Sequence, residues 1–199
     1  DVRGKRLTFG LRDVLITLGI ALFIGGVLLA YNYLFAPAGR EGSFVLVNPY
    51  TGGLPAGPAP TLGVPAPDFQ LPLLGGGTFK LSENRGRPVW VFFWATWCPP
   101  CRAEMPDIEK IWRDEKGNDL VIMAVDFAET AATVQPFVNK LGLTFPIGMD
   151  YNGRTMTEYR ITGFPSHFFI DKEGILREIR IGSMNEATMR EKIKKLRSY

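Results

Sequence analysis

The chemistry of this sequence is concentrated in two cysteines, Cys98 and Cys101, which are the only ones among its 199 residues. They stand three positions apart and enclose Pro99 and Pro100. A Cys-x-x-Cys pair supports thiol–disulfide exchange, in which one thiolate attacks a disulfide and the second thiol resolves the mixed disulfide. Two cysteines cannot build a framework of several structural bridges. The spacing therefore predicts a redox-active pair.

The neighbouring residues predict how the two thiols are held. Residues 89–94 are valine, tryptophan and phenylalanine, a composition typical of a buried strand, and a helix is expected from the cysteines through Trp112. Cys98 would then lie at a helix N-terminus, where free backbone N–H groups and the helix dipole favour a thiolate. We expect Cys98 to attack and Cys101 to resolve.

Metal binding is the alternative use of such thiols. A structural zinc site needs four ligands, and His167 is the only histidine that could join the two cysteines. Copper could bind soft thiolates together with His167, as in a Sco-type metallochaperone, but that family places three residues between its cysteines. The sequence therefore predicts neither a metal centre nor a cofactor, and the copper-binding protein stays as the alternative from a different functional class.

The charge distribution excludes one class of partner. The formal net charge is +3, and the first 13 residues contribute most of it, with four basic residues against two acidic ones. The rest of the chain carries almost no net charge, so it has no basic footprint for nucleic acid. We expect no nucleic-acid partner.

An uncharged apolar run at residues 14–31 predicts a membrane segment. As a helix it approaches the ~20 residues that cross the hydrocarbon core, and basic residues precede it. We expect a cytoplasmic flank at 1–13, a transmembrane signal-anchor helix at 14–36 and a catalytic domain outside the cytoplasm. A cleaved signal peptide is the alternative, because Ala36-Pro37-Ala38 loosely matches a cleavage site.

The remaining chain divides into a spacer and a domain. Residues 37–63 are rich in glycine and proline, which is typical of a semi-rigid linker, with a short strand conceivable at 43–47. A domain of residues 64–199 follows. Its pattern predicts a hairpin at 69–81, a strand at 120–126, a helix at 130–141, a short strand at 145–149, a weak helix at 152–160, a hairpin at 166–181 and a helix at 186–196. This order predicts an α/β fold with a mixed sheet covered on both faces.

The motif at residues 93–106, Phe-Trp-Ala-Thr-Trp-Cys-Pro-Pro-Cys-Arg-Ala-Glu-Met-Pro, resembles the active site of the membrane-anchored, thioredoxin-like TlpA/ResA family. Residues 66–69 resemble the start of that family's domain, and residues 163–171 its Gly-x-Pro-Thr-Thr-Phe-x-Ile-Asp segment. The resemblance covers residue 64 to the C-terminus. It implies a thioredoxin-like fold and a thiol–disulfide oxidoreductase. The peroxiredoxin pattern, in contrast, would need proline at Val91 and threonine at Ala95.

The resemblance also implies roles for individual residues. Pro165 would follow a cis peptide bond and face the cysteines, the backbone of Phe164 would bind an extended substrate strand, and Trp97 would form part of that surface. Glu104 would exchange a proton with Cys101, since ResA-like proteins have a functional glutamate there. Helical spacing also places Glu104 on the same face as Cys101, three residues earlier, and so near the resolving thiol. It lies largely outside the apolar face of Met105 and Ile108, however, so a solvent-facing helix residue is the alternative.

Two residues depart from the pattern. Phe92 occupies the position at which thioredoxin carries a buried carboxylate, so that proton acceptor is missing. His167 replaces the usual threonine or serine, and near the thiols it could stabilise Cys98 as an imidazolium; a structural histidine is the alternative.

The direction of electron flow cannot be read from the cysteines. By resemblance we expect a reductase of exported protein disulfides, with apocytochrome c as a candidate substrate and a transmembrane electron donor as partner. The alternative within redox enzymes is a dithiol oxidase that donates disulfides.

Overall fold

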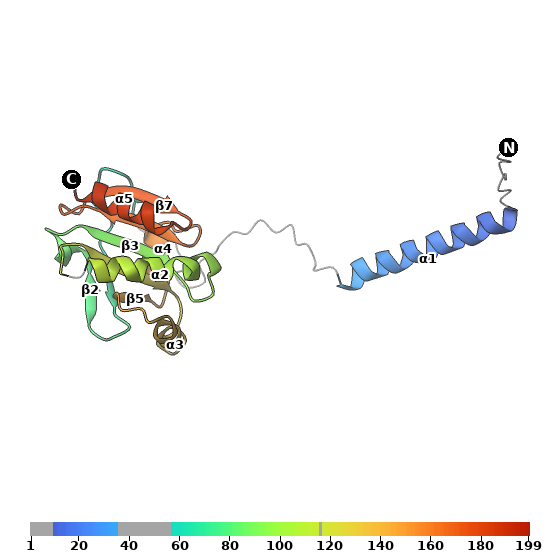
Figure 1. The fold of residues 1–199 in the computed structure, drawn as a ribbon, viewed down its shortest axis with the longest axis horizontal. Coiled ribbons are helices and arrows are strands. Elements are labelled where there is room, and N and C mark those ends of the chain that lie inside the picture. Colours follow the sequence, from blue (N-terminus) through green and yellow to red (C-terminus); the bar gives the residue numbers. More distant parts are fainter. Residues whose placement is uncertain (1–9, 36–56, 116) are drawn as a thin grey trace, which may run out of the picture. The chain divides into compact units, whose positions relative to one another are not determined.

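The computed structural model describes residues 10–35, 57–115 and 117–199. The chain divides into two compact units, Asp1–Leu46 and Val47–Tyr199, which are considered separately (Figure 1). Most of the expected N-terminal flank and linker, and the strand conceived at 43–47, lie outside the described residues.

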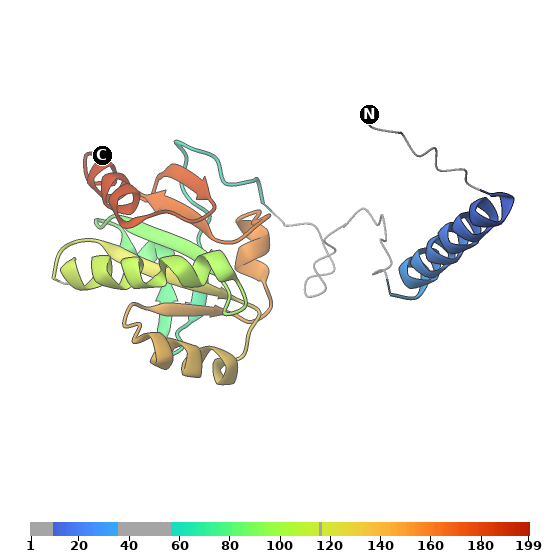
Figure 2. The same ribbon diagram turned by 45° about the vertical axis from the view of Figure 1, so that its right-hand side comes forward.

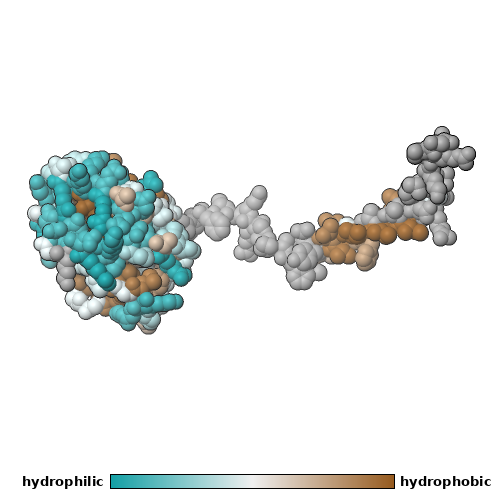
Figure 3. Space-filling model, viewed as in Figure 1, coloured by the Kyte–Doolittle hydropathy of each residue, from teal (hydrophilic) through white to brown (hydrophobic). Residues whose placement is uncertain are grey.

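The first unit contains one described helix, α1 (Leu11–Phe35), which covers the uncharged run. Its described side chains include large apolar groups that are exposed, such as Leu22 and Phe23. Figure 3 shows hydrophobic residues along this helix in brown. Among the residues that the structure describes, no helix combines the length and apolarity needed to cross a membrane. The transmembrane segment at 14–36 therefore stays a prediction from the sequence.

The second unit is built on a mixed five-stranded sheet in the order β5-β4-β3-β6-β7. Its strands are β3 (Val89–Trp94), β4 (Val121–Phe127), β5 (Ile147–Asp150), β6 (Ser166–Ile170) and β7 (Leu176–Ile181). β3, β4 and β5 run parallel, whereas β6 and β7 are antiparallel to their neighbours. Because parallel strands end at the same edge, the loop after β3 and the end of β4 lie together.

The central strand β3 is buried on both faces, as its continuous apolar sequence predicts. Trp90, Phe92 and Trp94 point to one core and the alternating residues Val91 and Phe93 to the other. The first core lies beneath helices α2 (Pro99–Asp114), α3 (Ala131–Leu141) and α5 (Glu186–Leu196). Figures 1 and 2 show α2 lying across the sheet with α5 along one side of it and α3 along the other.

The second core is covered by smaller elements. The hairpin β1 (Gln70–Pro72) and β2 (Thr78–Lys80), the 3-10 helix η1 (Leu81–Asn84) and residues after α4 (Arg154–Glu158) contribute side chains to it. Tyr159 anchors this layer, because its buried hydroxyl donates to the carbonyl of Pro67 at 2.8 Å. The sheet is thus covered on both faces, and the predicted elements of residues 64–199 are confirmed with small shifts at their ends.

Candidate active site

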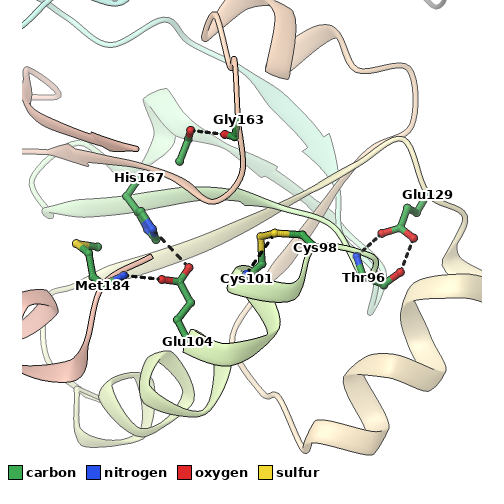
Figure 4. The surroundings of a disulfide bond; sticks show 9 residues. Thr96, Cys98, Cys101, Glu104, Glu129, Gly163, His167 and Met184 are labelled. Atoms are coloured by element: carbon green, nitrogen blue, oxygen red, sulfur yellow. Dashed lines mark hydrogen bonds and ion pairs between the residues drawn. A yellow bond between two sulfur atoms is a disulfide. The ribbon is translucent and has the colours of Figure 1, made fainter. Parts of the chain in front are cut away.

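Cys98 and Cys101 form a disulfide, with an S–S distance of 1.98 Å, at the start of α2 (Figure 4). Cys98 is the N-cap residue of this helix, and both cysteines are buried. The backbone N–H of Cys101 donates to the sulfur of Cys98 at 3.2 Å. The expected strand–thiol–helix arrangement is confirmed.

The two prolines between the cysteines explain that contact. Pro99 and Pro100 take the first two positions of α2, where a helix has backbone N–H groups without internal partners. Proline has no N–H, so these two positions offer no donor. The N–H of Cys101 is therefore the first one of the helix that can stabilise negative charge on Cys98.

Trp97, Phe164 and the buried Pro165 belong to two loops, the one that carries Cys98 and the one that precedes β6. Trp97 is 59% exposed, and its ring packs edge-on against Phe164 with centroids 5.7 Å apart. Phe164 in turn packs against the core cluster that contains both cysteines. The peptide bond between Phe164 and Pro165 is cis, as the family resemblance implied. The structure thus brings together the exposed tryptophan and the cis-proline loop.

Glu104 is not at the surface, so its placement outside the apolar face of α2 is wrong. It is only 3% exposed, because the chain between β7 and α5 crosses over it. The N–H of Met184, in that segment, donates to its Oε2 atom at 3.0 Å. Burial, which outweighs this hydrogen bond, raises the pKa of Glu104 to about 8. The carboxyl group is therefore mostly protonated at neutral pH.

His167 is fully buried in β6, and its Nε2 atom lies 3.4 Å from Oε1 of Glu104 (Figure 4). Its ring packs near Trp90 and Phe92, with centroids 5.9 Å from each. Burial, and secondarily the charge of Arg180, lowers the pKa of His167 to about 3. The histidine is thus neutral, and its suggested role as an imidazolium that stabilises the Cys98 thiolate is wrong.

Glu129 was not predicted from the sequence, yet it forms hydrogen bonds with the loop that carries Cys98. Its carboxylate accepts the backbone N–H and the hydroxyl of Thr96, both at 2.6 Å (Figure 4). Thr96 lies two residues before Cys98, so these hydrogen bonds hold the loop between β3 and α2. Glu129 follows the end of β4, and only the register of the sheet brings it to Thr96.

Asp126 is the second acid that sequence reasoning missed. It ends the apolar run of β4, pairs in register with Trp94 and is fully buried. Neither of its carboxylate oxygens has a hydrogen-bond partner in the described part of the chain. Burial, and then the nearby charge of Glu129, raises its pKa to about 8. Phe92 is buried and apolar, but the adjacent strand places a buried acid, Asp126, opposite Trp94 near the same end of the sheet.

Within the described residues, no group of three or more histidine, cysteine, aspartate or glutamate side chains is arranged to hold a metal ion. The two sulfurs are joined to each other, and His167 faces Glu104.

Comparison with known proteins agrees with this geometry. The profile of the AhpC/TSA family matches residues 62–179. The thiol-disulfide oxidoreductase ResA of Geobacillus kaustophilus is 38% identical over 128 residues, which cover 64% of this chain and 74% of that protein.

Two solved structures have a similar fold. The first is a thiol:disulfide interchange protein of the thioredoxin family from Chlorobium tepidum, with a TM-score of 0.62 and 26% identity over 71% of this chain and 99% of that one. StoA from Bacillus subtilis has a TM-score of 0.58 and 28% identity over 65% of this chain and 98% of its own. The chain therefore belongs to the thioredoxin-like AhpC/TSA family, among its ResA-type thiol-disulfide oxidoreductases.

Proposed function

We propose that this protein is a membrane-anchored, extracytoplasmic reductase of disulfides in exported proteins. The observation that carries the redox activity is the Cys98–Cys101 disulfide at the N-terminus of α2 beside the cis-proline loop. The proposed chemistry needs no further group, since the pair itself exchanges two electrons with a protein disulfide.

The reduced pair acts in two displacement steps. The thiolate of Cys98 attacks one sulfur of the substrate disulfide, which forms a mixed disulfide and releases the first substrate thiolate. Cys101 then loses its proton and attacks the sulfur of Cys98, which releases the second substrate thiolate and restores the disulfide. Both substrate thiolates take protons from water. The substrate gains two electrons, and the Cys-Pro-Pro-Cys pair loses them.

Glu104 exchanges the proton of Cys101 in this scheme. Its side chain projects from α2 one turn after Cys101, and its raised pKa places it close to the range in which a group can both take and return a proton. As a carboxylate it accepts the proton when Cys101 attacks. When a donor dithiol later attacks Cys98, Cys101 leaves as a thiolate and Glu104 returns the proton.

The substrate docks as an extended segment across Trp97, Phe164 and Pro165. The exposed ring of Trp97 offers apolar area next to the cysteines, and the Phe164 ring supports it from the neighbouring loop. Aromatic rings that are exposed beside a reactive group contribute contact area with little loss of side-chain entropy. An apocytochrome c with a Cys-x-x-Cys-His segment is the candidate substrate.

The membrane anchor is proposed from residues 14–36. The uncharged run at 14–31, the basic residues before it and the exposed apolar side chains of α1 support this assignment. A reductase outside the cytoplasm works in an oxidising compartment, so its Cys98–Cys101 disulfide must be reduced again after each cycle. We therefore include a transmembrane dithiol donor as a partner. Protease protection in sealed vesicles tests the topology, and cleavage of the domain from the cytoplasmic side would refute it.

Trapping of the mixed disulfide tests the mechanism. In Cys101→Ser the second step cannot occur, so partner proteins should stay covalently attached to Cys98 and be released by dithiothreitol. Cys98→Ser is the matched control and should trap none. Adducts on Cys101 in Cys98→Ser, together with no adducts on Cys98 in Cys101→Ser, would reverse the assigned order of attack.

The reduction potential tests the direction. A reductase requires a potential well below that of the glutathione pool, near the thioredoxin value of about −270 mV. A potential near the oxidising extreme of about −120 mV would instead identify a dithiol oxidase that donates disulfides. Equilibration of the full chain with glutathione buffers separates the two.

A further inference from the structure

The polar contact between Glu104 and His167 lies in an otherwise apolar part of the core. Both side chains are almost fully buried, and Trp90 and Phe92 pack near the histidine ring. In the described part of the chain, Oε1 of Glu104 and both ring nitrogens of His167 make no hydrogen bond of good geometry. The closest approach of these groups is the 3.4 Å separation between Oε1 and Nε2. Each side chain thus has the other as its polar side-chain neighbour, beside the backbone of Met184 for Glu104 and that of Gly182 for His167.

We infer that His167 is the positioning partner of Glu104: its Nε2 atom holds the buried carboxyl group and lets it carry or lose one proton without standing unpartnered in the core. This inference rests on the proposed proton exchange between Glu104 and Cys101. Nothing in the family pattern supplies it, because the usual residue at this position is threonine or serine.

The chemistry of a neutral imidazole fits this task. The ring has one N–H and one lone pair. With the N–H on Nε2 it can donate to Oε1 both when that atom is the carbonyl oxygen of the protonated acid and when it belongs to the carboxylate, so no ring proton has to move. An unpartnered carboxylate in an apolar core costs far more than an unpartnered neutral acid. Because the ring stays neutral, the pair has no net charge when Glu104 is protonated and a single negative charge when it is not.

Other charges act on the pair from its neighbouring elements. Asp107, on α2, raises the pKa of Glu104, and the N–H of Met184 lowers it. Arg180, opposite His167 on β7, disfavours protonation of the ring. Loss of the Nε2 atom should therefore penalise mainly the ionised form of Glu104, since among these contacts the Met184 N–H alone would still stabilise the carboxylate.

The first test replaces His167 while keeping Glu104. His167→Phe keeps an aromatic ring between Trp90 and Phe92 but removes both nitrogens. His167→Gln restores a polar atom near the Nε2 position, and His167→Asn restores one near Nδ1. We expect the carboxylate fraction of Glu104 at pH 7 to fall about tenfold in His167→Phe, which corresponds to a pKa higher by about one unit. His167→Gln should restore the wild-type pKa of Glu104, and His167→Asn should not.

The readouts separate the two halves of the cycle. Oxidation of the reduced full chain by a substrate disulfide needs Glu104 as a base, so His167→Phe should slow mixed-disulfide resolution about tenfold at pH 7. Reduction of the Cys98–Cys101 disulfide by dithiothreitol needs Glu104 as an acid and should keep its rate. The infrared C=O band of the protonated Glu104 should also shift in His167→Phe and return to its wild-type position in His167→Gln.

Two outcomes would overturn the inference. Equal behaviour of His167→Gln and His167→Asn, or equal slowing of both half-reactions in His167→Phe, would mean that His167 acts only by packing. Glu104→Gln identifies the infrared band and tests the proposed function separately. If Glu104→Gln leaves resolution and its pH profile unchanged, the proton role of Glu104 fails. If it slows resolution while His167→Phe does not, only the role of His167 fails.

Discussion

The acids on the two sides of the active-site disulfide differ in their partners (Figure 4). On one side Glu104 faces a neutral histidine and a backbone N–H. On the other side Asp126 lies near Glu129, whose own carboxylate is occupied by Thr96. Burial raises the pKa of both Glu104 and Asp126 to about 8.

A raised pKa therefore does not by itself assign a catalytic role. Glu104 sits on the helix that begins at the cysteines, one turn from Cys101, and has partners that suit proton exchange. Asp126 lies near the end of β4, where the carboxylates of Glu129 and Asp150 oppose its ionisation more than the backbone of Glu129 favours it. We therefore expect Glu104 to serve the chemistry and the Asp126–Glu129 side to position the loop.

The largest effect should come from exchanging each acid for its amide. Glu104→Gln should slow resolution of the mixed disulfide by about 10²–10⁴-fold, the range for loss of a general acid–base group. Asp126→Asn, which changes the same kind of group on the other side, should leave this step within a few-fold of wild type. Stopped-flow oxidation of the reduced chain by a disulfide substrate measures both. A comparable loss in Asp126→Asn would remove the distinction between the two sides.

The pH dependence of stability should reveal both acids at once. Their pKa values are higher in the folded chain than in the unfolded one, so the folded state binds more protons between about pH 4 and 8. The contribution of the two acids to stability should therefore be greatest at the acidic end of this window and fall as pH rises toward 8, by at most about 1.4 kcal/mol per pH unit for each acid.

Buried His167 acts in the opposite direction. Its pKa is lower in the folded chain, so its contribution is present above about pH 6.5 and is lost as pH falls toward 3. Denaturant unfolding at several pH values measures the net curve. Glu104→Gln and Asp126→Asn should each flatten the loss toward pH 8, and an unchanged slope in either variant would show that the acid does not titrate there.

A smaller effect is expected from the carboxylate that holds the active-site loop. Glu129→Ala removes both hydrogen bonds to Thr96 and should reduce the free energy of unfolding by about 1.5–3 kcal/mol, the range for hydrogen bonds to a charged group. Glu129→Gln keeps an acceptor for the N–H and a donor for the hydroxyl, so it should retain most of this energy. It should also lower the pKa of Asp126, because the neighbouring charge is gone.

Equal losses in the two Glu129 variants would mean that the charge, rather than the tether, stabilises the loop. Urea unfolding at pH 7 gives the free energies, and carboxyl chemical shifts give the pKa of Asp126.

The smallest effect separates the two hydrogen bonds of Thr96. Thr96→Val removes the hydroxyl but keeps the shape of the side chain and the backbone N–H, so it should cost about 1 kcal/mol. Thr96→Ser keeps both donors and should cost less. The free energies of unfolding of Thr96→Val and Thr96→Ser test this prediction. A larger loss in Thr96→Ser than in Thr96→Val would assign the effect to the methyl group instead.

Those parts of the protein that depend on local pattern are predictable from its residues alone. The continuous apolar runs of β3 and β4, the turn residues of the hairpins and the helix after Cys98 follow from residue periodicity, and each element appears where it is expected. The Cys-x-x-Cys spacing is equally local, since a helix start brings residues 98 and 101 within disulfide distance.

The tertiary structure decided the environment of the charged groups. Helical spacing puts Glu104 on the same face of α2 as Cys101 and Ile108. A segment 80 residues later then covers its carboxyl group and donates a backbone N–H to it. Glu129 meets Thr96 through the register of two parallel strands, and His167 meets Glu104 through the pairing of β6 with β3. Burial and partner choice are long-range properties, so the pKa values that distinguish the two sides of the disulfide could not be read from the sequence.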